Sequence, residues 1–283
     1  MELVELQIFK AVAEQGGITK AATALHRVQS NVTTRVKQLE ERLGTKLFHR
    51  QGRKLVLSSE GKLLLSYADR LLRLSAEAQA ALRGHAPHGL FKLGSLESTA
   101  ATRLPLVLAA YHRAHPAVRL DLVTGTSGAL VDRVLRGEIE AAFVAEPFRA
   151  KNLEAQHAFT EELVLITPKS HGPVSTPKEI ERRVVLAFPT GCSYRRRLES
   201  WLGRSSVVAE RVMEYASYHA ITACVAAGGG IAVVPRSVLR VAAAEGQVAV
   251  HALPPRVSKA RTMLVWPRGH QSAALTALRQ ELR

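Results

Sequence analysis

The 283-residue sequence predicts an α/β protein in which an all-α N-terminal part precedes a larger domain of alternating strands and helices. Three observations lead to this fold class. Apolar residues recur with helical spacing up to residue 44, a proline-free heptad pattern covers residues 59–83, and short apolar runs alternate with helical patterns beyond residue 90. With 47% hydrophobic residues, the chain can bury the cores of two or three domains.

The N-terminal segment is predicted to form three helices. An initial apolar stripe predicts the first, which ends at Gly16-Gly17. Thr19 has the position of an N-cap for a short second helix. A third helix should begin at Gln29 or Ser30, one of which would cap it, and should end at Gly44. Its buried face is predicted to comprise Val32, Val36, Leu39 and Leu43, and its polar outer face Asn31, Thr34, Arg35 and Gln38.

A hairpin is predicted directly after the third helix. Segments 46–50 and 54–57 have the composition of short strands, and the turn between them contains Gly52. Three helices, of which the last has a polar outer face, followed by a hairpin, are the layout of a winged helix-turn-helix domain. We expect this domain to cover residues 1–58.

A long helix and a hinge are predicted over residues 59–89. Between 59 and 83 the only internal glycine is Gly61, in the first turn. A seam of apolar and small residues with alternating spacings of four and three is typical of a dimerising helix. The alternative is that the seam packs on its own domain. The seam comprises Leu64, Ala68, Leu71, Ser75, Ala78 and Leu82.

Residues 90–283 are predicted to form an α/β domain. Continuous apolar strands that alternate with helices favour a mostly parallel sheet. In the first set, strands are expected at 90–94, 118–123 and 139–144, and helices at 104–112 and 130–136. A second set of segments follows at 163–167, 184–188, 194–201, 207–212, 217–227 and 231–235.

The charge of the chain predicts a polyanionic partner. The net charge is +15 with a pI near 10.4, and nucleic acid or an anionic membrane surface are the usual partners of so basic a protein. Residues 20–62 hold ten Lys and Arg against three Glu, a local charge of +7 within the predicted helix-turn-helix. This concentration of charge favours nucleic acid.

Several classes of function lack support in the sequence. The sequence contains no run of eighteen or more apolar residues, so no membrane span is predicted. The N-terminal residues lack the basic region of a signal peptide. Cys192 and Cys224 are the only cysteines, which favours a reducing cytoplasm. The eleven histidines form no His-x-x-x-His pattern, and no nucleotide-type glycine motif is present. We therefore expect a cytoplasmic protein with no catalytic residue, metal or cofactor, and not an enzyme.

Residues in register along most of the chain resemble the LysR-type transcriptional regulators. The strongest matches are Ala21-Ala22, Leu25, Gln29-Ser30, Val32-Thr33, Val36, Leu39-Glu40, Leu43-Gly44, Leu47-Phe48, Arg50, Arg53, Leu57-Ser58 and Glu60-Gly61. Weaker matches are Leu104-Pro105, His115-Pro116, 137–140 and 228–235. Two residues depart from the pattern, because Val28 stands where the family usually has a capping Ser, and Glu140 stands where it usually has Asp.

The resemblance implies a two-lobed α/β effector domain similar to periplasmic binding proteins. Lobe I would cover about 90–162 and 267–283, and lobe II about 163–266. Two crossover strands, near 161–167 and 261–266, would join the lobes, and an effector would bind between them. The implied partners are double-stranded DNA, a small-molecule effector and further copies of the chain in a homodimer or homotetramer, with RNA polymerase as a further candidate and no membrane.

The candidate DNA contacts lie on the third helix and the hairpin. Gln and Asn can pair with adenine, Arg with guanine, and a Thr methyl can touch thymine. Because two-fold proteins recognise two-fold sites, we expect an inverted-repeat operator. Base contacts are expected from Gln29, Ser30, Asn31, Thr33, Thr34 and Arg35, and phosphate contacts from Thr19, Lys37, Arg50, Arg53 and Lys54.

The candidate effector contacts lie on three loops that follow predicted strands. Small hydroxyl residues beside helix N-termini suit a carboxylate or another small anion. The same residues are also ordinary helix caps, and this alternative stays open. The candidates are Ser98 and Thr99, Thr126 and Ser127, and Gly191, Cys192, Ser193 and Tyr194. Glu97 and Glu146 would favour an amine or an amino acid instead, if they point inward.

Cys192 supports two alternative functions. It precedes Arg195, Arg196 and Arg197 at a predicted helix N-terminus, an environment that lowers the pKa of a thiol. A thiol-based redox-sensing regulator is one alternative. The other is an enzyme fused to a DNA-binding unit, in which Cys192 would act as a nucleophile with a histidine as base.

Overall fold

The computed structural model describes residues 1–51, 54–83, 86–148, 151–181 and 183–282, with the side chains of these residues except 54, 73, 77 and 80–83. The chain divides into two compact units, of which one holds the chain before residue 86 and the other nearly all of the chain after it.

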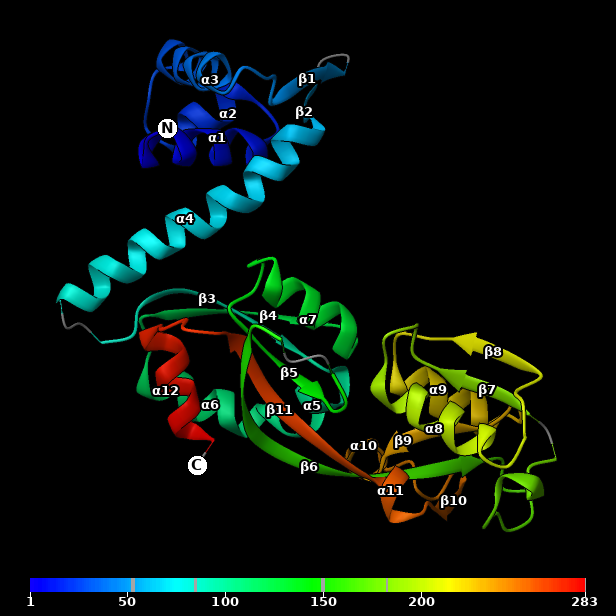
Figure 1. Cartoon of the computed structure of the whole chain (residues 1–283). Coiled ribbons are helices and arrows are strands. Elements are labelled where there is room, and N and C mark those ends of the chain that lie inside the picture. Colours follow the sequence, from blue (N-terminus) through cyan, green and yellow to red (C-terminus); the bar gives the residue numbers. More distant parts are fainter. Residues whose placement is uncertain (52–53, 84–85, 149–150, 182, 283) are drawn as a thin grey trace. The chain divides into compact units, whose positions relative to one another are not determined.

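The first unit has the predicted order of elements (Figure 1). Its helices are α1 (Leu3–Gln15), α2 (Ile18–Ala24), α3 (Gln29–Leu43) and α4 (Ser59–Arg83), and its strands are β1 (Phe48–Gln51) and β2 (Lys54–Leu57). Gly16 and Gly44 end α1 and α3 with φ of 66° and 67°, in the left-handed region that glycine adopts without strain. β1 and β2 pair antiparallel as the predicted hairpin.

The structure corrects three local predictions. Thr19 is not an N-cap, because α2 begins one residue earlier and its N-cap is Gly17. Neither Gln29 nor Ser30 caps α3, whose N-cap is Val28 without a side-chain hydrogen bond. Leu43, predicted to be buried, is 40% exposed, whereas Glu40 one turn earlier and Leu47 after the helix are buried.

The predicted seam of α4 is wrong in its first turns. Ala68 is fully buried in the core of its own unit, and Leu64, Leu65 and Leu72 pack against that core. A different stripe on α4 is left exposed, namely Leu63 at 60%, Tyr67 at 50% and Leu74 at 61%, with Leu71 at 38% beside it. Heptad spacing alone did not distinguish the two faces, because both are apolar. Leu82 lies outside the described side chains.

The second unit contains the remaining elements (Figure 1). Its strands are β3 (Gly89–Ser95), β4 (Val118–Thr124), β5 (Ala141–Ala145), β6 (Leu153–Thr167), β7 (Val184–Ala187), β8 (Arg211–Glu214), β9 (Ala232–Pro235), β10 (Ala249–Ala252) and β11 (Lys259–Pro267). Its helices are α5 (Glu97–Thr102), α6 (Leu104–Ala114), α7 (Ser127–Leu135), α8 (Ser193–Gly203), α9 (Tyr218–Ala226), α10 (Arg236–Val241), α11 (Pro255–Ser258) and α12 (Ala273–Glu281), with a 3₁₀ turn η1 at Pro177–Glu179. The sequence predicted a loop where α5 lies and missed α10, β10 and α11.

The main sheet is mixed rather than mostly parallel. Its order is β10-β6-β11-β5-β3-β4, and β9 also pairs with β6. β3 is parallel to β4 and β5, but β11 runs antiparallel to both β5 and β6. The other elements of the second unit form two groups, one of β3–β5 with α5–α7 and α12, and one of β7–β10 with α8–α11 (Figure 1). The sheet is not mostly parallel because β6 and β11 are long antiparallel strands that run side by side and connect these two groups.

β6 changes partners midway along its length. Its residues from Leu153 to Glu162 pair with β11, whereas Leu163 to Thr167 pair with β9 and β10. The strand therefore belongs to one group of elements before residue 163 and to the other group after it.

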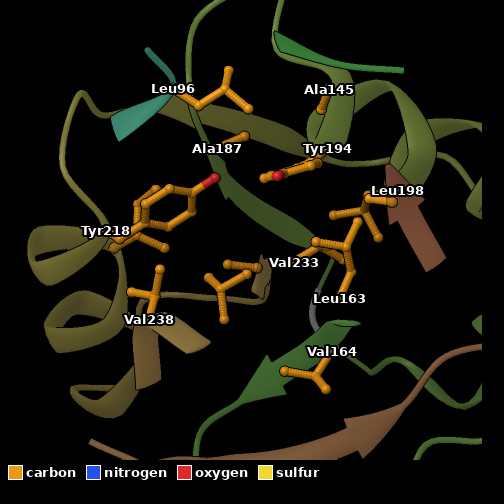
Figure 2. Close-up of a cluster of buried hydrophobic side chains, with 14 of the residues drawn as sticks. Leu96, Ala145, Leu163, Val164, Ala187, Tyr194, Leu198, Tyr218, Val233 and Val238 are labelled. Carbon is orange, nitrogen blue, oxygen red and sulfur yellow. The ribbon is translucent and has the colours of Figure 1, made fainter. Parts of the chain in front are cut away.

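Two buried clusters form the core of the second unit. One lies between β3, β5 and β11 and the helices α6 and α12, with Phe91, Tyr111 and Trp266 among its residues. The other is continuous across the two groups of elements, because it joins Leu96 and Leu130 to Tyr194 and Tyr218. Figure 2 shows part of this second cluster.

Candidate nucleic-acid interface and ligand pocket

The predicted base-contacting residues form the open surface of α3. Gln29, Ser30, Asn31 and Thr34 are exposed, while Thr33 and Arg35 are half-buried. The Thr33 hydroxyl donates to the Gln29 carbonyl at 2.9 Å, and Asn31 Oδ1 accepts from Arg27 at 3.4 Å. The start of α3 thus presents a set of amide and hydroxyl groups of the kind that read base edges.

The predicted phosphate contacts lie around this surface. Thr19, Lys37 and Arg50 are exposed on α2, α3 and β1. Lys54 begins β2, but its side chain lies outside the described part of the structure, as does the whole of Arg53.

Glu40 holds the base of the hairpin, a role that sequence reasoning missed. Its Oε1 accepts hydrogen bonds from the backbone N–H of Leu47 at 2.8 Å and of Phe48 at 3.4 Å. Its Oε2 accepts from Lys46 Nζ at 2.9 Å. Burial raises the pKa of this carboxyl, but the hydrogen bonds from Lys46 and Leu47 outweigh it and hold the pKa below the ordinary value. The pair Leu39-Glu40 was part of the family resemblance, but the sequence pattern around Glu40 did not indicate its contacts with the hairpin.

A second contact fixes the start of α4 against the same segment. Ser58 Oγ donates to the Lys46 carbonyl at 2.7 Å and accepts from the Gly61 N–H at 2.8 Å. A Cβ on Gly61 would lie far inside contact distance of the Leu47 carbonyl oxygen. Glycine is therefore required there by close approach of the backbone.

A small pocket with a free volume of about 10 Å³ lies between the two groups of elements in the second unit. This is room for about one water molecule and far less than a typical ligand pocket, so a larger ligand fits only when the two sides move apart. Six of the eight predicted effector residues line it, whereas Thr99, which is buried, and Gly191 do not. The lining comprises Leu96, Glu97, Ser98, Gly125, Thr126, Ser127, Ala145, Phe188, Cys192, Ser193, Tyr194 and Tyr218. Sequence reasoning missed Tyr218 and Phe188.

Some of the predicted groups are already used to join the two sides of the pocket. Ser193 Oγ donates to the Ala145 carbonyl at 2.8 Å, and Ser127 Oγ accepts from the Ala145 N–H at 3.1 Å. The N–H of Gly128 donates to the Gly191 carbonyl at 3.2 Å. The predicted anion cradle at these helix starts is thus partly occupied by the protein's own backbone.

Other polar groups around the pocket are buried without a hydrogen bond. Among the described side chains, these atoms are Glu97 Oε2, Ser98 Oγ, Thr99 Oγ1, Tyr194 OH and Thr262 Oγ1. Ser98 lies close to the hydroxyls of both Tyr194 and Tyr218, but not in hydrogen-bonding geometry. Figure 2 shows the two tyrosine hydroxyls directed toward one another below Leu96. Buried polar atoms normally have hydrogen-bond partners, so these groups retain unused hydrogen-bonding capacity.

Burial shifts the pKa values of ionisable groups at the pocket. Burial raises the pKa of Glu97, although the backbone N–H of Tyr218 acts in the opposite direction. Burial also raises the pKa of Tyr194 and of Tyr218. Behind the pocket, Glu161 is paired with Arg103 Nε at 2.6 Å and with the Ser237 hydroxyl at 2.8 Å. Glu146 does not line the pocket and pairs with Arg261 at 3.7 Å.

The expected activation of Cys192 is wrong. Burial raises the pKa of its thiol, and the backbone N–H groups of Arg195 and Tyr194 only partly oppose this effect. Arg195 is itself occupied by ion pairs with Glu199 and Glu214, both at 2.7 Å. Arg195 and Arg196 favour the thiolate only weakly, and burial outweighs their effect on the pKa of the thiol.

Among the described residues, no group of three or more His, Cys, Asp or Glu could hold a metal ion. No helix in those parts of the chain is long and apolar enough to cross a membrane.

Two family models match the chain. Residues 3–62 match the bacterial regulatory helix-turn-helix protein, lysR family, and residues 84–283 match the LysR substrate binding domain. The uncharacterized HTH-type transcriptional regulator YusT of Bacillus subtilis (strain 168) is 42% identical over 94% of this chain and 89% of its own length. GltR of the same strain, also an HTH-type transcriptional regulator, is 38% identical over 94% of this chain and 90% of its own length.

Solved structures share the fold. Full-length CbnR complexed with its target DNA has a TM-score of 0.68 and 25% identity, over 100% of this chain and 99% of CbnR. The relatives with a stated role are transcriptional regulators rather than enzymes.

Proposed function

Since the chain belongs to the LysR family of DNA-binding transcriptional regulators, we propose that it binds an inverted-repeat operator and that a small molecule in the second unit modulates this binding. The observation that carries the first part is the open polar surface at the start of α3. One such helix per half-site would enter the major groove. As a regulator of this family it would act in the cytoplasm, with RNA polymerase as a further candidate partner.

We propose that base recognition comes from Gln29, Asn31 and Arg35, with smaller contributions from Ser30, Thr33 and Thr34. Phosphate contacts would come from Thr19, Lys37, Arg50, Arg53 and Lys54. The experiment is footprinting of the pure protein on its own upstream DNA over a range of salt concentrations. Two protected half-sites and a steep loss of affinity with salt are expected. A single unpaired half-site, or affinity that is indifferent to salt, would contradict the proposal.

We propose a homodimer that forms through α4, with pairing of dimers into a tetramer as a further step. The exposed stripe of Leu63, Tyr67 and Leu74 supports this proposal, because an apolar face on a long helix normally has a partner. The stripe replaces the seam predicted from the sequence, of which Ala68 is already buried.

We propose that the effector binds in the pocket between lobes I and II and is a small carboxylate. The support is the group of buried hydroxyls without hydrogen bonds, since Ser98, Tyr194 and Thr262 can each donate to a carboxylate oxygen. Residues 90–283 also carry 25 Lys and Arg against 16 Asp and Glu, so the surroundings are electropositive. Thr126, Ser127, Gly191, Cys192 and Ser193 would complete the site, with Thr99 behind it.

Glu97 favours a second candidate ligand, an amino acid. Its carboxyl lines the pocket and has one buried oxygen without a hydrogen bond. A ligand ammonium beside it would restore the charged carboxylate and form an ion pair. Calorimetry with carboxylates, amino acids and amines distinguishes the two candidates, because only the amino acid should lose affinity in Glu97→Gln. Tight binding of a neutral molecule or of an amine without a carboxylate would contradict both.

The effector would act by favouring one arrangement of the two lobes. The bonds from Ser193 to Ala145 and from Gly128 to Gly191 join the two sides of the pocket. A ligand shifts the arrangement only as far as its affinity differs between the open and closed forms. A change in operator affinity or promoter output on adding the effector is therefore expected, and its absence would contradict this part of the proposal.

A further inference from the structure

A second pocket lies on α8, away from the hydroxyl pocket, and we call it the arginine pocket. Its volume is about 330 Å³, at the lower end of the range of small-molecule sites. It is lined by Pro147, Arg196, Arg197, Ser200, Trp201, Arg204, Arg256 and Val257. No predicted site residue is among them.

The arginines of this pocket lack carboxylate partners. Two carboxylates near α8, those of Glu199 and Glu214, are both bound to Arg195, outside the pocket. Glu146, which precedes Pro147, pairs with Arg261. Within the described residues, none of Arg196, Arg197, Arg204 and Arg256 forms an ion pair, so four guanidinium groups surround one hollow without neutralisation.

Two of these arginines are held in place by backbone carbonyls. Arg197 Nη1 donates to the carbonyls of Arg256 and Lys259 at 3.3 and 3.1 Å, and its Nη2 donates to the Glu146 carbonyl at 3.1 Å. Its Nε is buried without a partner. Arg196 Nη2 donates to the Pro147 carbonyl at 2.7 Å. The wall of the pocket is thus preorganised, whereas Arg204 and Arg256 are exposed at its rim.

We propose that the arginine pocket binds a phosphorylated small molecule, as a site separate from the effector pocket. Four cationic groups need a ligand with more than one negative charge, and a single carboxylate supplies only one. A phosphate group carries nearly two charges and three acceptor oxygens, which the planar fork of a guanidinium matches in pairs. The concave shape favours a small molecule over the extended backbone of a nucleic acid.

The position on α8 links this site to the effector pocket. Ser193 and Tyr194 in the first turn of α8 line the effector pocket, while Arg196 and Arg197 on the next turn and Arg204 directly after the helix line the arginine pocket. A ligand at either site therefore contacts the same helix. The proposal stands whether or not the effector proposed above is a carboxylate, because the two pockets share no lining residue.

The test is calorimetry of the full-length protein with inorganic pyrophosphate, and separately with citrate, at near-physiological ionic strength. The test variant is the double substitution Arg204→Gln and Arg256→Gln, which spares the arginines that bind backbone carbonyls. The matched control is Arg211→Gln with Arg240→Gln, two exposed arginines of the same unit outside the pocket. Thermal melting checks that both variants are folded.

Saturable binding of one pyrophosphate per chain is expected. The test variant should bind it about 100-fold more weakly, since each charge-assisted contact accounts for about tenfold, while the control retains the affinity. Absence of saturable heat, equal losses in both variants, or binding of citrate alone would overturn the proposal. If pyrophosphate does not bind and the test variant loses affinity for random-sequence DNA, the pocket holds a nucleic-acid backbone instead, and the proposal is wrong.

Discussion

The buried carboxylate of Glu40 on α3 accepts a 2.8 Å hydrogen bond from the backbone N–H of Leu47 at the base of the hairpin. This contact ties α3 to the β1–β2 hairpin, so the two elements keep a fixed relation to each other. Phe48 N–H and Lys46 Nζ complete the set of donors around the same carboxylate.

Glu40→Ala should lower the free energy of unfolding of the first unit by about 2–4 kcal/mol, because it leaves buried N–H groups without an acceptor. Urea unfolding measures this loss, and Glu41→Ala, at an exposed neighbouring position, serves as the control. An unchanged stability in Glu40→Ala would show that the contact contributes nothing.

The same carboxyl predicts a pH dependence. The folded state lowers the pKa of Glu40 below its ordinary value of 4.5. Its contribution to stability is therefore complete above about pH 4.5 and is lost as the pH falls through the folded-state pKa. The difference in stability between the parent and Glu40→Gln should shrink over that acidic range. A difference that stays constant with pH would contradict the lowered pKa.

Gly61→Ala should destabilise the first unit by about 2 kcal/mol or more, because the added Cβ would overlap the Leu47 carbonyl oxygen. Ala favours helices over Gly by about 1 kcal/mol, so a gain in stability would be expected if the site had room. Thermal melting decides the sign, with Lys62→Ala as the exposed neighbour for comparison. A more stable Gly61→Ala protein would show that the two backbones are not in close contact.

Variants of α3 should separate base recognition from phosphate binding. Asn31→Ala and Arg35→Ala should reduce the discrimination between bases by about 1–3 kcal/mol. Lys37→Ala should instead weaken binding to all DNA sequences alike, and should reduce the slope of log affinity against log salt concentration by about one. Competition on randomised half-sites measures both effects. Equal losses on specific and random DNA for all three variants would refute the assignment.

Leu74→Asp should break the dimer, because it places a charge within the exposed stripe of α4 at a cost of several kcal/mol in an apolar interface. Ala76→Asp is the control, since Ala76 is exposed on another face of the same helix. Sedimentation should show monomers only for Leu74→Asp. A stable dimer from this variant would mean that the subunits join elsewhere.

Tyr194→Phe should bind the effector more weakly without loss of stability. The Tyr194 hydroxyl is buried without a partner, so its removal should leave the free protein as stable as before or up to about 1 kcal/mol more stable. Tyr111→Phe is the matched control, because the Tyr111 hydroxyl donates to the Ala274 carbonyl at 3.0 Å. That variant should be destabilised by about 1–2 kcal/mol and should bind the effector normally. A destabilised Tyr194→Phe protein would show that its hydroxyl serves the fold.

The candidate sites were predicted to different degrees for a physical reason. The surface of α3 was predictable because one helix carries all of its base-contacting residues at regular spacing. For the effector pocket, loops that follow strands indicated six of the eight candidates correctly as lining residues. Tyr218 and Thr262 were not foreseen, because they lie on α9 and β11, and only long-range packing brings Tyr218 beside Ser98 and Thr262 beside Tyr194.

What the sequence by itself determined is the set of local structures: the helices that end at Gly16 and Gly44, the hairpin, and the alternation of strands and helices. These depend on backbone preferences and on apolar periodicity among neighbouring residues. The tertiary structure alone decided which face of α4 is buried, that β6 and β11 run antiparallel, and that Ser193 binds Ala145 while Tyr194 is left without a partner. Each of these depends on which distant segments meet, and a local pattern is the same whichever partner it finds.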